Sequence, residues 1–251
     1  MSSPETENDR NMALGTDEVH LWSAPLDVRA DKLAALSRVL DREERDRALR
    51  FRFELDRVRW TAARGWLRHL LASYLGTEPA EVRFSQCSPG KPRLAARSHW
   101  LRFNVSHSAD MVAIAVAHSR EVGIDLESTR GGGSAEVVPL RFLSEREQAA
   151  LVRLSGQARR RTSLQFWTGK EAYLKAVGLG LRGPVAEIDV ALPLEHRIGV
   201  IAEPHVGIPG DWSLHTFDAG PDYVGAVVVQ GLRARVPVAA RPMQLAEGNG
   251  G

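Results

Sequence analysis

The chain has little cysteine and no long apolar run. Its single cysteine among 251 residues, Cys87, excludes an internal disulfide framework and a cysteine-based zinc site. No apolar run approaches the roughly 20 residues that a membrane-spanning helix requires. The polar, acidic start, MSSPETENDRNMALG, lacks the apolar stretch of a signal peptide. The sequence therefore predicts a soluble, cytoplasmic protein.

Charge of neither sign dominates. The chain has 33 basic and 31 acidic residues, and its formal net charge is +2. This balance gives no general attraction to nucleic acid or to an acidic membrane. The segment 42–68 is locally basic, since nine arginines stand against five acidic residues there. Such a segment can bind a polyanion, but it is more often a solvated helix face with internal ion pairs.

Lysine is scarce, and most of the positively charged residues are arginines. A lysine ammonium can release a proton, which a guanidinium effectively cannot. Two of the lysines lie in FWTGKEAYLKAVGLGL (166–181), a helical pattern that breaks at Gly178. There Glu171 and Lys175 form an i, i+4 pair, which on its own would be an ordinary solvated pair. The clustering favours a functional site. The four lysines are Lys32, Lys91, Lys170 and Lys175.

The order of the expected elements indicates an α+β protein. Each half has strands and a long helix, so we predict two similar lobes, an N-terminal lobe over 18–119 and a C-terminal lobe over 120–232. Disordered tails are expected at 1–17 and 240–251. Ser144 and Glu147 form a capping box. Strands are expected at 19–26, 81–84, 102–108, 111–118, 121–127, 187–192, 197–202, 212–217 and 223–229, and helices at 31–40, 41–51, 56–75, after Ser144 and at 162–177.

The stretch GIDLE places two carboxylates on one face of a predicted strand. Asp125 and Glu127 are two residues apart, and side chains at i and i+2 of a strand share a face. Adjacent carboxylates repel each other unless a cation or a proton lies between them. Oxygen ligands of this kind suit Mg²⁺ together with water and a substrate phosphate. The alternative is an edge strand whose charges discourage aggregation.

Two further stretches offer groups that could contact phosphate. FNVSHS (103–108) contains Asn104, Ser106 and His107, but it lacks the Gly-x-Ser-x-Gly frame of a nucleophile elbow. Asn104 and Ser106 could instead satisfy backbone groups at a strand end. CSPGKPRL presents Lys91 in a turn beside Pro92, and this turn is not a P-loop. An ordinary hairpin turn is the alternative for Lys91.

Taken in this order, four stretches resemble the 4′-phosphopantetheinyl transferase superfamily, and most closely its long, surfactin-type monomeric branch. The matching stretches are GKP (90–92), FNVSHS (103–108), GIDLE (123–127) and WTGKEAYLKAVGLGL (167–181), and the likeness extends over about 19–230. The resemblance implies a pseudo-dimer of two similar α+β lobes, with the active site in the cleft between them. It also implies transfer of the 4′-phosphopantetheine arm of coenzyme A to a serine of an apo acyl or peptidyl carrier protein. The leaving group is then 3′,5′-ADP.

The resemblance also implies roles for individual residues. Asp125, Glu127 and Glu171 would bind Mg²⁺, and Lys175 would contact the departing phosphate. Lys170 lies on a different helix face and would contact a phosphate or the other lobe, whereas Trp167, Ala172 and Leu174 would be packing residues. The expected coenzyme contacts are His107 at the pyrophosphate, Lys91 with Pro92 and Ser106 at the 3′-phosphate, and Arg47, Arg59 and neighbouring Trp60 elsewhere on coenzyme A.

Two other classes of function stay open. A degenerate relative could bind coenzyme A or a carrier protein without catalysis, although simple docking has no need of three metal-binding carboxylates. The arginines of 42–68 could instead bind nucleic acid, which would show as a steep salt dependence of affinity. The balanced net charge argues against that, so we expect neither nucleic acid nor membrane as a partner.

Overall fold

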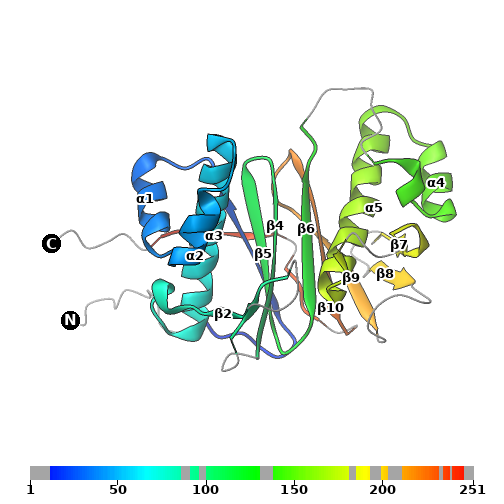
Figure 1. Ribbon diagram of the computed structural model, residues 1–251. Helices are drawn as coiled ribbons and strands as arrows, with labels where there is room; N and C mark the ends of the chain where they lie inside the picture. The colour runs from blue at the N-terminus through cyan, green and yellow to red at the C-terminus, as the bar shows by residue number, and fades with distance from the viewer. Residues whose placement is uncertain are drawn as a thin grey trace, which may run out of the picture. The chain divides into compact units, whose positions relative to one another are not determined.

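Figure 1 shows the computed structural model of the chain. The structure describes residues 12–85, 91–95, 100–130, 138–180, 185–192, 199–202, 211–231, 234–237 and 239–245. Cys87 and the glycines at 131–133 lie outside these ranges. The chain divides into two compact units: unit 1 is Met1–Leu14, Leu26–Arg83 and Gln244–Gly251, and unit 2 is Gly15–Pro25 and Phe84–Met243. Within the described ranges, no helix is both long and apolar enough to cross a bilayer.

Unit 1 is helical. It contains α1 (Ala30–Arg38), α2 (Arg42–Ala48), α3 (Glu54–Leu75) and the short 3₁₀ helix η1 (Pro79–Glu81). Helix α3 ends at Gly76, whose φ of 64° is the left-handed conformation that glycine adopts without strain. Gly65 lets α1 approach α3, because a Cβ at this position would lie 2.6 Å from the Leu36 carbonyl oxygen.

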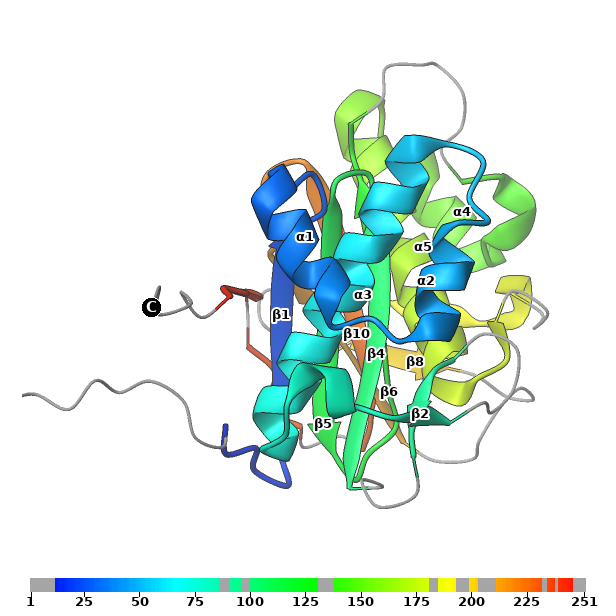
Figure 2. The same cartoon turned by 60° about the vertical axis from the view of Figure 1, so that its left-hand side comes forward.

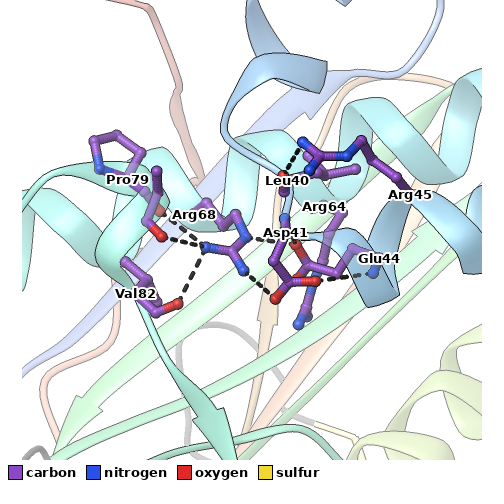
Figure 3. A network of polar contacts seen from close by, with 9 residues as sticks. Leu40, Asp41, Glu44, Arg45, Arg64, Arg68, Pro79 and Val82 are labelled. Atoms are coloured by element: carbon purple, nitrogen blue, oxygen red, sulfur yellow. Dashed lines mark hydrogen bonds and ion pairs between the residues drawn. The ribbon is translucent and has the colours of Figure 1, made fainter.

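A buried ionic network connects the helices of unit 1 (Figure 3). The fully buried Arg68 donates hydrogen bonds to Glu44 at 2.7 Å and to Asp41 at 2.8 Å, and also to three backbone carbonyls between residues 79 and 82. Arg64 forms a second ion pair with Glu44. Asp41 and Glu44 are also the capping box of α2. At least these arginines of the basic segment therefore have a structural role, as the ion-pair alternative predicts.

Unit 2 contains two larger sheets, which are mainly antiparallel, and a two-stranded ribbon. The first sheet has the order β11-β1-β5-β4, and the second has the order β6-β10-β9-β8-β7. Figure 2 shows β11 beside β1, and this pair is the one parallel pairing among the named strands. The first sheet comprises β1 (Val19–Pro25), β4 (Leu101–Ser108), β5 (Met111–His118) and β11 (Arg241–Pro242). The second comprises β6 (Val122–Ser128), β7 (Asp189–Ala191), β8 (Gly199–Ala202), β9 (Trp212–Phe217) and β10 (Tyr223–Gln230), and the ribbon pairs β2 (Phe84–Ser85) with β3 (Arg93–Leu94).

Helix α5 (Gly156–Val177) packs against β6 and β10 of the second sheet. Gly123 on β6 permits this packing, because a Cβ there would lie 1.9 Å from the carbonyl oxygen of Ala172 on α5. The neighbouring α4 (Glu145–Val152) begins with the predicted capping box of Ser144 and Glu147. The 3₁₀ helices η3 (Leu140–Phe142) and η5 (Val185–Glu187) complete this side of the unit.

Strand β6 lies between α5 on one side and β4 on the other (Figure 1). Its even-numbered residues, Val122, Ile124 and Leu126, belong to an apolar core shared with β1, β5 and β10. Its odd-numbered Gly123 faces α5. Because side chains alternate along a strand, Asp125 and Glu127 lie on the same side of β6 as Gly123.

The α+β class and most of the predicted elements are confirmed. The predicted strand at 81–84 is wrong for its first residues, because Glu81 ends η1 and β2 starts at Phe84, and α5 begins at Gly156 rather than at 162. Strand β11 lies within the segment expected to be a tail. The two compact units have bounds that differ from those of the predicted lobes, and the lobe boundaries stay a prediction.

Candidate active site

Three carboxylates from β6 and α5 come together in unit 2. Asp125 and Glu127 lie on β6, and Glu171 lies on the helix that Gly123 allows to pack closely against this strand. Burial and the charges of Asp125 and Glu127 together raise the pKa of Glu171 to about 7, against the opposing effect of the Lys175 ammonium. The negative charges of these three side chains therefore act on one another, as the sequence predicts for Asp125 and Glu127.

Asp125 is the most buried member of this group, with 4% of its surface exposed. Its Oδ1 accepts hydrogen bonds from the Lys175 ammonium at 2.6 Å and from the Ser106 hydroxyl at 2.8 Å. Burial still raises the pKa of Asp125, against the opposing effects of Lys175 and Ser106. Its second oxygen, Oδ2, is buried and has no hydrogen-bond partner among the described residues.

Glu127 is held by donors on two other elements. The Ser108 hydroxyl on β4 donates to Glu127 Oε2 at 2.8 Å, and Trp167 on α5 provides a second hydrogen bond. Burial raises the pKa of Glu127, and the neighbouring charge of Asp125 adds to this effect. The interaction gives Trp167 a contact with the site in addition to the packing role that the sequence predicts.

Lys175 donates hydrogen bonds within the site, and His107 lies within reach of its charges. Lys175 reaches across from α5 to Asp125 and also donates to Ser106 at 2.9 Å. Partial desolvation and the Lys175 charge lower the pKa of the exposed His107 imidazole, so the neutral ring is favoured at pH 7. The charged pair on this helix therefore does not form the solvated i, i+4 bridge that the spacing alone would suggest.

The donor chemistry of this cluster fits a hard divalent cation. Asp125 Oδ2 and Glu171 Oε1 are both buried and unpartnered within the described part of the chain, and carboxylate oxygens are ligands that Mg²⁺ prefers. Yet no three His, Cys, Asp or Glu side chains of the described residues are already arranged around one metal position. The cluster thus fits the ion in ligand type, and side-chain rotations would have to gather the oxygens around it.

Lys91 and Ser106, which the resemblance assigns to one phosphate, have different partners in the structure. Lys91 donates to the Glu121 carboxylate at 3.0 Å and to the backbone carbonyls of Val122 and Ala176 at 3.1 and 3.0 Å. These three acceptors match the three protons of an ammonium. Burial lowers the pKa of Lys91, although Glu121 opposes the shift. Pro92 follows it in the chain and is half-buried.

The remaining predicted coenzyme contacts lie in unit 1. The Arg47 guanidinium stacks over the ring of Trp60 at 5.6 Å, and Phe51 lies 6.0 Å from the same ring. Arg59 forms two hydrogen bonds with Asp27, at 3.0 and 3.2 Å. Arg47, Arg59 and Trp60 thus form a basic and aromatic group on α2 and α3. None of the carboxylates of unit 2 belongs to it.

The expected phosphate contact of Lys170 is wrong. Its side chain is fully buried and donates to the backbone carbonyls of Phe142 at 2.8 Å and Val185 at 3.1 Å. It also forms an ion pair with Glu147 at 2.7 Å. Among the described residues, Lys170 thus binds α4 and its neighbouring segments and makes no hydrogen bond or ion pair with Asp125 or Glu127, although it directly precedes Glu171.

Sequence reasoning also missed Ser108, whose hydroxyl contacts Glu127. The available signal was the period of two in NVSHS, which places Asn104, Ser106 and Ser108 on one face of β4. The acceptors of Lys170 carried no such signal, because two of them are backbone carbonyls, which every residue has.

Comparisons with known proteins identify the family of the chain. Residues 26–119 match the family described as 4′-phosphopantetheinyl transferase, N-terminal, and residues 121–228 match the 4′-phosphopantetheinyl transferase superfamily. The chain is 40% identical over 223 residues to the 4′-phosphopantetheinyl transferase HetI of Nostoc sp., covering 88% of this chain and 91% of that protein.

Two further relatives carry the same name. A putative 4′-phosphopantetheinyl transferase of Synechocystis sp. is 31% identical over 197 residues, covering 77% of each chain. The 4′-phosphopantetheinyl transferase Sfp of Bacillus subtilis is 28% identical over 188 residues, covering 74% of this chain and 80% of its own. The likeness to HetI extends over nearly the whole of both chains, and the chain therefore belongs to the 4′-phosphopantetheinyl transferase superfamily.

Proposed function

We propose that this phosphopantetheinyl transferase moves the 4′-phosphopantetheine arm of coenzyme A to a serine of an apo acyl or peptidyl carrier protein. The serine oxygen attacks the β-phosphorus of the coenzyme A pyrophosphate and forms a new phosphoester bond. The bond from that phosphorus to the bridging oxygen breaks, and 3′,5′-ADP leaves with the electron pair. The serine proton passes to a base. The observation that carries this proposal is the meeting of Asp125, Glu127, Glu171 and Lys175 in unit 2.

Asp125, Glu127 and Glu171 are the proposed ligands of Mg²⁺. The support is the all-oxygen donor set and the two buried oxygens without partners among the described residues. When bound, the ion supplies positive charge against the negative charge that builds up on the pyrophosphate during transfer. The carboxylates that would hold this charge come from β6 and α5, two elements that pack closely at Gly123.

Lys175 is the proposed group at the departing phosphate. Its ammonium already lies at the carboxylate cluster, where it contacts Asp125 and Ser106, and 27% of its side chain is exposed. A cation in this position can donate a hydrogen bond or a proton to a phosphate oxygen. Glu171 is the proposed acceptor of the serine proton, directly or through water, because it comes from the same helix face one turn earlier.

The proposed coenzyme contacts are those that the resemblance implies. His107 binds the pyrophosphate region from its exposed position at the end of β4. Lys91, with Pro92, binds the 3′-phosphate, which requires its ammonium to exchange one protein acceptor for a phosphate oxygen. Ser106, whose hydroxyl contacts Asp125 and Lys175, is the second proposed contact to the 3′-phosphate. Arg47 and Arg59, with Trp60 beside them, are proposed contacts to the rest of the coenzyme.

The proposed acceptors are carrier domains of polyketide, peptide or fatty-acid synthases. We propose that the enzyme works as a monomer in the cytoplasm, since all of the proposed metal ligands and Lys175 come from one chain. A protein that only bound coenzyme A or a carrier would need the basic contacts, but it would have no use for a group of carboxylates in which Asp125 and Glu127 raise the pKa of Glu171.

Intact-protein mass spectrometry tests the proposal. Purified enzyme is incubated with an apo carrier protein, coenzyme A and Mg²⁺, and the carrier should gain one phosphopantetheine mass. Excess chelator should stop the reaction, and added Mg²⁺ should restore it. Full turnover in chelator would refute the metal assignment, whereas binding of coenzyme A without modification of any acyl or peptidyl carrier would favour the non-catalytic alternative.

A further inference from the structure

Strands β4 and β6 face each other as the outer strands of two different sheets. Three alternating polar side chains of β4 make hydrogen bonds to β6. Asn104 Oδ1 accepts from the Ile124 amide at 2.9 Å, and the Ser106 hydroxyl donates to Asp125 at 2.8 Å. Ser108 forms the third contact, described below. We call these three residues, Asn104, Ser106 and Ser108, the polar ladder; it sets the register between the two strands.

Ser108 contacts β6 twice through one oxygen atom. Its hydroxyl accepts a hydrogen bond from the Ser128 amide at 3.0 Å and donates to Glu127 Oε2 at 2.8 Å. A hydroxyl has a single proton. Because the amide of Ser128 occupies an acceptor site of this oxygen, the proton is directed to the carboxylate. The contact thus ties the Glu127 side chain to the backbone of its own strand.

The chain that follows Ser108 is also fixed in place. Ala109 adopts a left-handed φ of 51° in the turn between β4 and β5. The next residue, Asp110, accepts hydrogen bonds from the Tyr223 hydroxyl and from the Arg130 guanidinium, the latter at 3.1 Å. A side chain at the end of β4 therefore sits on a turn that is anchored to β10 and to the chain after β6, which suits a role that depends on fixed position.

We propose that Ser108 is a positioning residue that orients the Glu127 carboxylate for a divalent ion shared with Asp125. The inference rests on the proposed function, in which Glu127 is a metal ligand. Without the hydroxyl, Glu127 loses one of its donors and the Ser128 amide loses its acceptor. Removal of a group that orients a metal ligand typically weakens metal binding by about 10- to 100-fold.

Titration with Mn²⁺ alone, followed through the spin-resonance signal of the free ion, tests this role on the full chain. Ser108→Ala should weaken Mn²⁺ binding by about tenfold. Ser108→Thr, which keeps the hydroxyl, should restore affinity to within about threefold of the wild type. Ser213→Ala is the matched control. Ser213 is a buried serine on β9, and its hydroxyl donates to the Gly231 carbonyl at 2.8 Å. The control variant should leave Mn²⁺ affinity unchanged.

A second measurement separates positioning from general stability. In carrier modification, Ser108→Ala should raise the Mg²⁺ concentration for half-maximal rate by about tenfold, and rate at saturating Mg²⁺ should largely recover. A residue that only stabilised the fold would lower the melting temperature without moving this midpoint. If Ser108→Ala does not fold, Ser108→Cys, which keeps the size but donates weakly, takes its place in both experiments.

Glu127→Gln distinguishes failure of this inference from failure of the proposed function. If Glu127→Gln weakens Mn²⁺ binding but Ser108→Ala does not, the inference about Ser108 is overturned and the metal assignment stands. If neither Glu127→Gln nor Ser108→Ala changes Mn²⁺ binding, the assignment of Glu127 as a ligand is overturned together with the inference. An equal loss from Ser108→Ala in the wild-type and Glu127→Gln backgrounds would also overturn it, because Ser108 would then act elsewhere.

Discussion

Lys170 and Glu171 are neighbours on α5, but they belong to two ionic centres of opposite character. Lys170 is fully buried and donates to Glu147 and to two backbone carbonyls, so each of its protons has an acceptor. Glu171 faces two other carboxylates, and its buried Oε1 has no partner among the described residues. We call these the closed centre, around Lys170 and Glu147, and the open centre, around Asp125, Glu127, Glu171 and Lys175.

The difference shows how to separate a structural ion pair from a functional one. The closed centre resembles the Arg68 network of unit 1, in which charges and carbonyls are also matched (Figure 3). Such centres fix elements to one another. Buried acceptors without donors cost folding free energy, so an open centre is evidence that these carboxylates serve a purpose other than stability.

The largest expected effect comes from breaking the closed centre. Lys170→Met should lower the free energy of unfolding by about 3–5 kcal/mol, because it leaves the buried Glu147 carboxylate without its cation. Denaturant unfolding measures this change. Lys32→Met is a matched control, since Lys32 lies over the Trp66 ring at 4.7 Å and should contribute only about 0.5–1 kcal/mol. If both variants lost the same free energy of unfolding, the structural role of the Lys170–Glu147 ion pair would be contradicted.

Neutralising a carboxylate of the open centre should affect turnover instead. Glu171→Gln should reduce carrier modification by at least about a hundredfold, the scale of losing one contact that stabilises the transition state. The melting temperature should stay the same or rise, because one of three crowded carboxylates is removed. Glu147→Gln, the same change in the closed centre, should instead lower stability and preserve turnover per folded molecule. Near-normal turnover of Glu171→Gln would contradict the assignment.

Lys175→Ala should also reduce turnover by about a hundredfold, because the departing 3′,5′-ADP loses its cation. Asp125 loses its ion-pair partner in this variant, and its already raised pKa allows it to take up a proton. Steady-state kinetics with an apo carrier measure the effect. An activity loss that simply followed a lowered melting temperature would show that Lys175 belongs with the closed type of centre.

A smaller effect is expected at Lys91, whose surroundings resemble a closed centre. Lys91→Ala should lower the affinity for coenzyme A by roughly tenfold, the scale of one charge-assisted hydrogen bond. The affinity for 3′-dephospho-coenzyme A should change much less, since it lacks the 3′-phosphate. Titration calorimetry compares the two ligands. Equal losses would indicate that Lys91 serves only Glu121 and the carbonyls of Val122 and Ala176.

The last expected effect is a pH dependence of stability in the metal-free protein. The pKa of Glu171 is raised from 4.5 to about 7 on folding, so folding favours its neutral form. Its contribution to stability is fully present below about pH 4.5 and is lost as the pH rises through about 7. Thermal melting in chelator should therefore show a decrease over this range. The decrease should be shallower in Glu171→Gln, and identical slopes would contradict the raised pKa.

The sequence by itself determined the elements and the faces of the site. Periodicity predicted α3, β4, β5, β6 and β10, and the capping box placed the start of α4. The spacing of two in GIDLE put Asp125 and Glu127 on one face of β6. These features are local, because they depend on side-chain direction within a single helix or strand. The order of the four motifs was sufficient to indicate the family to which the chain belongs.

Only the tertiary structure decided which of these groups meet. Ser106 contacts Asp125 and Lys175, and Ser108 contacts Glu127 across two sheets. Lys170 and Glu171 are adjacent in sequence. Each proton of the Lys170 ammonium has an acceptor, whereas Glu171 Oε1 has no donor among the described residues. The acceptors that make this difference include backbone carbonyls far along the chain, which leave no signature in the sequence. Their positions follow from packing, such as the close approach of β6 to α5 at Gly123.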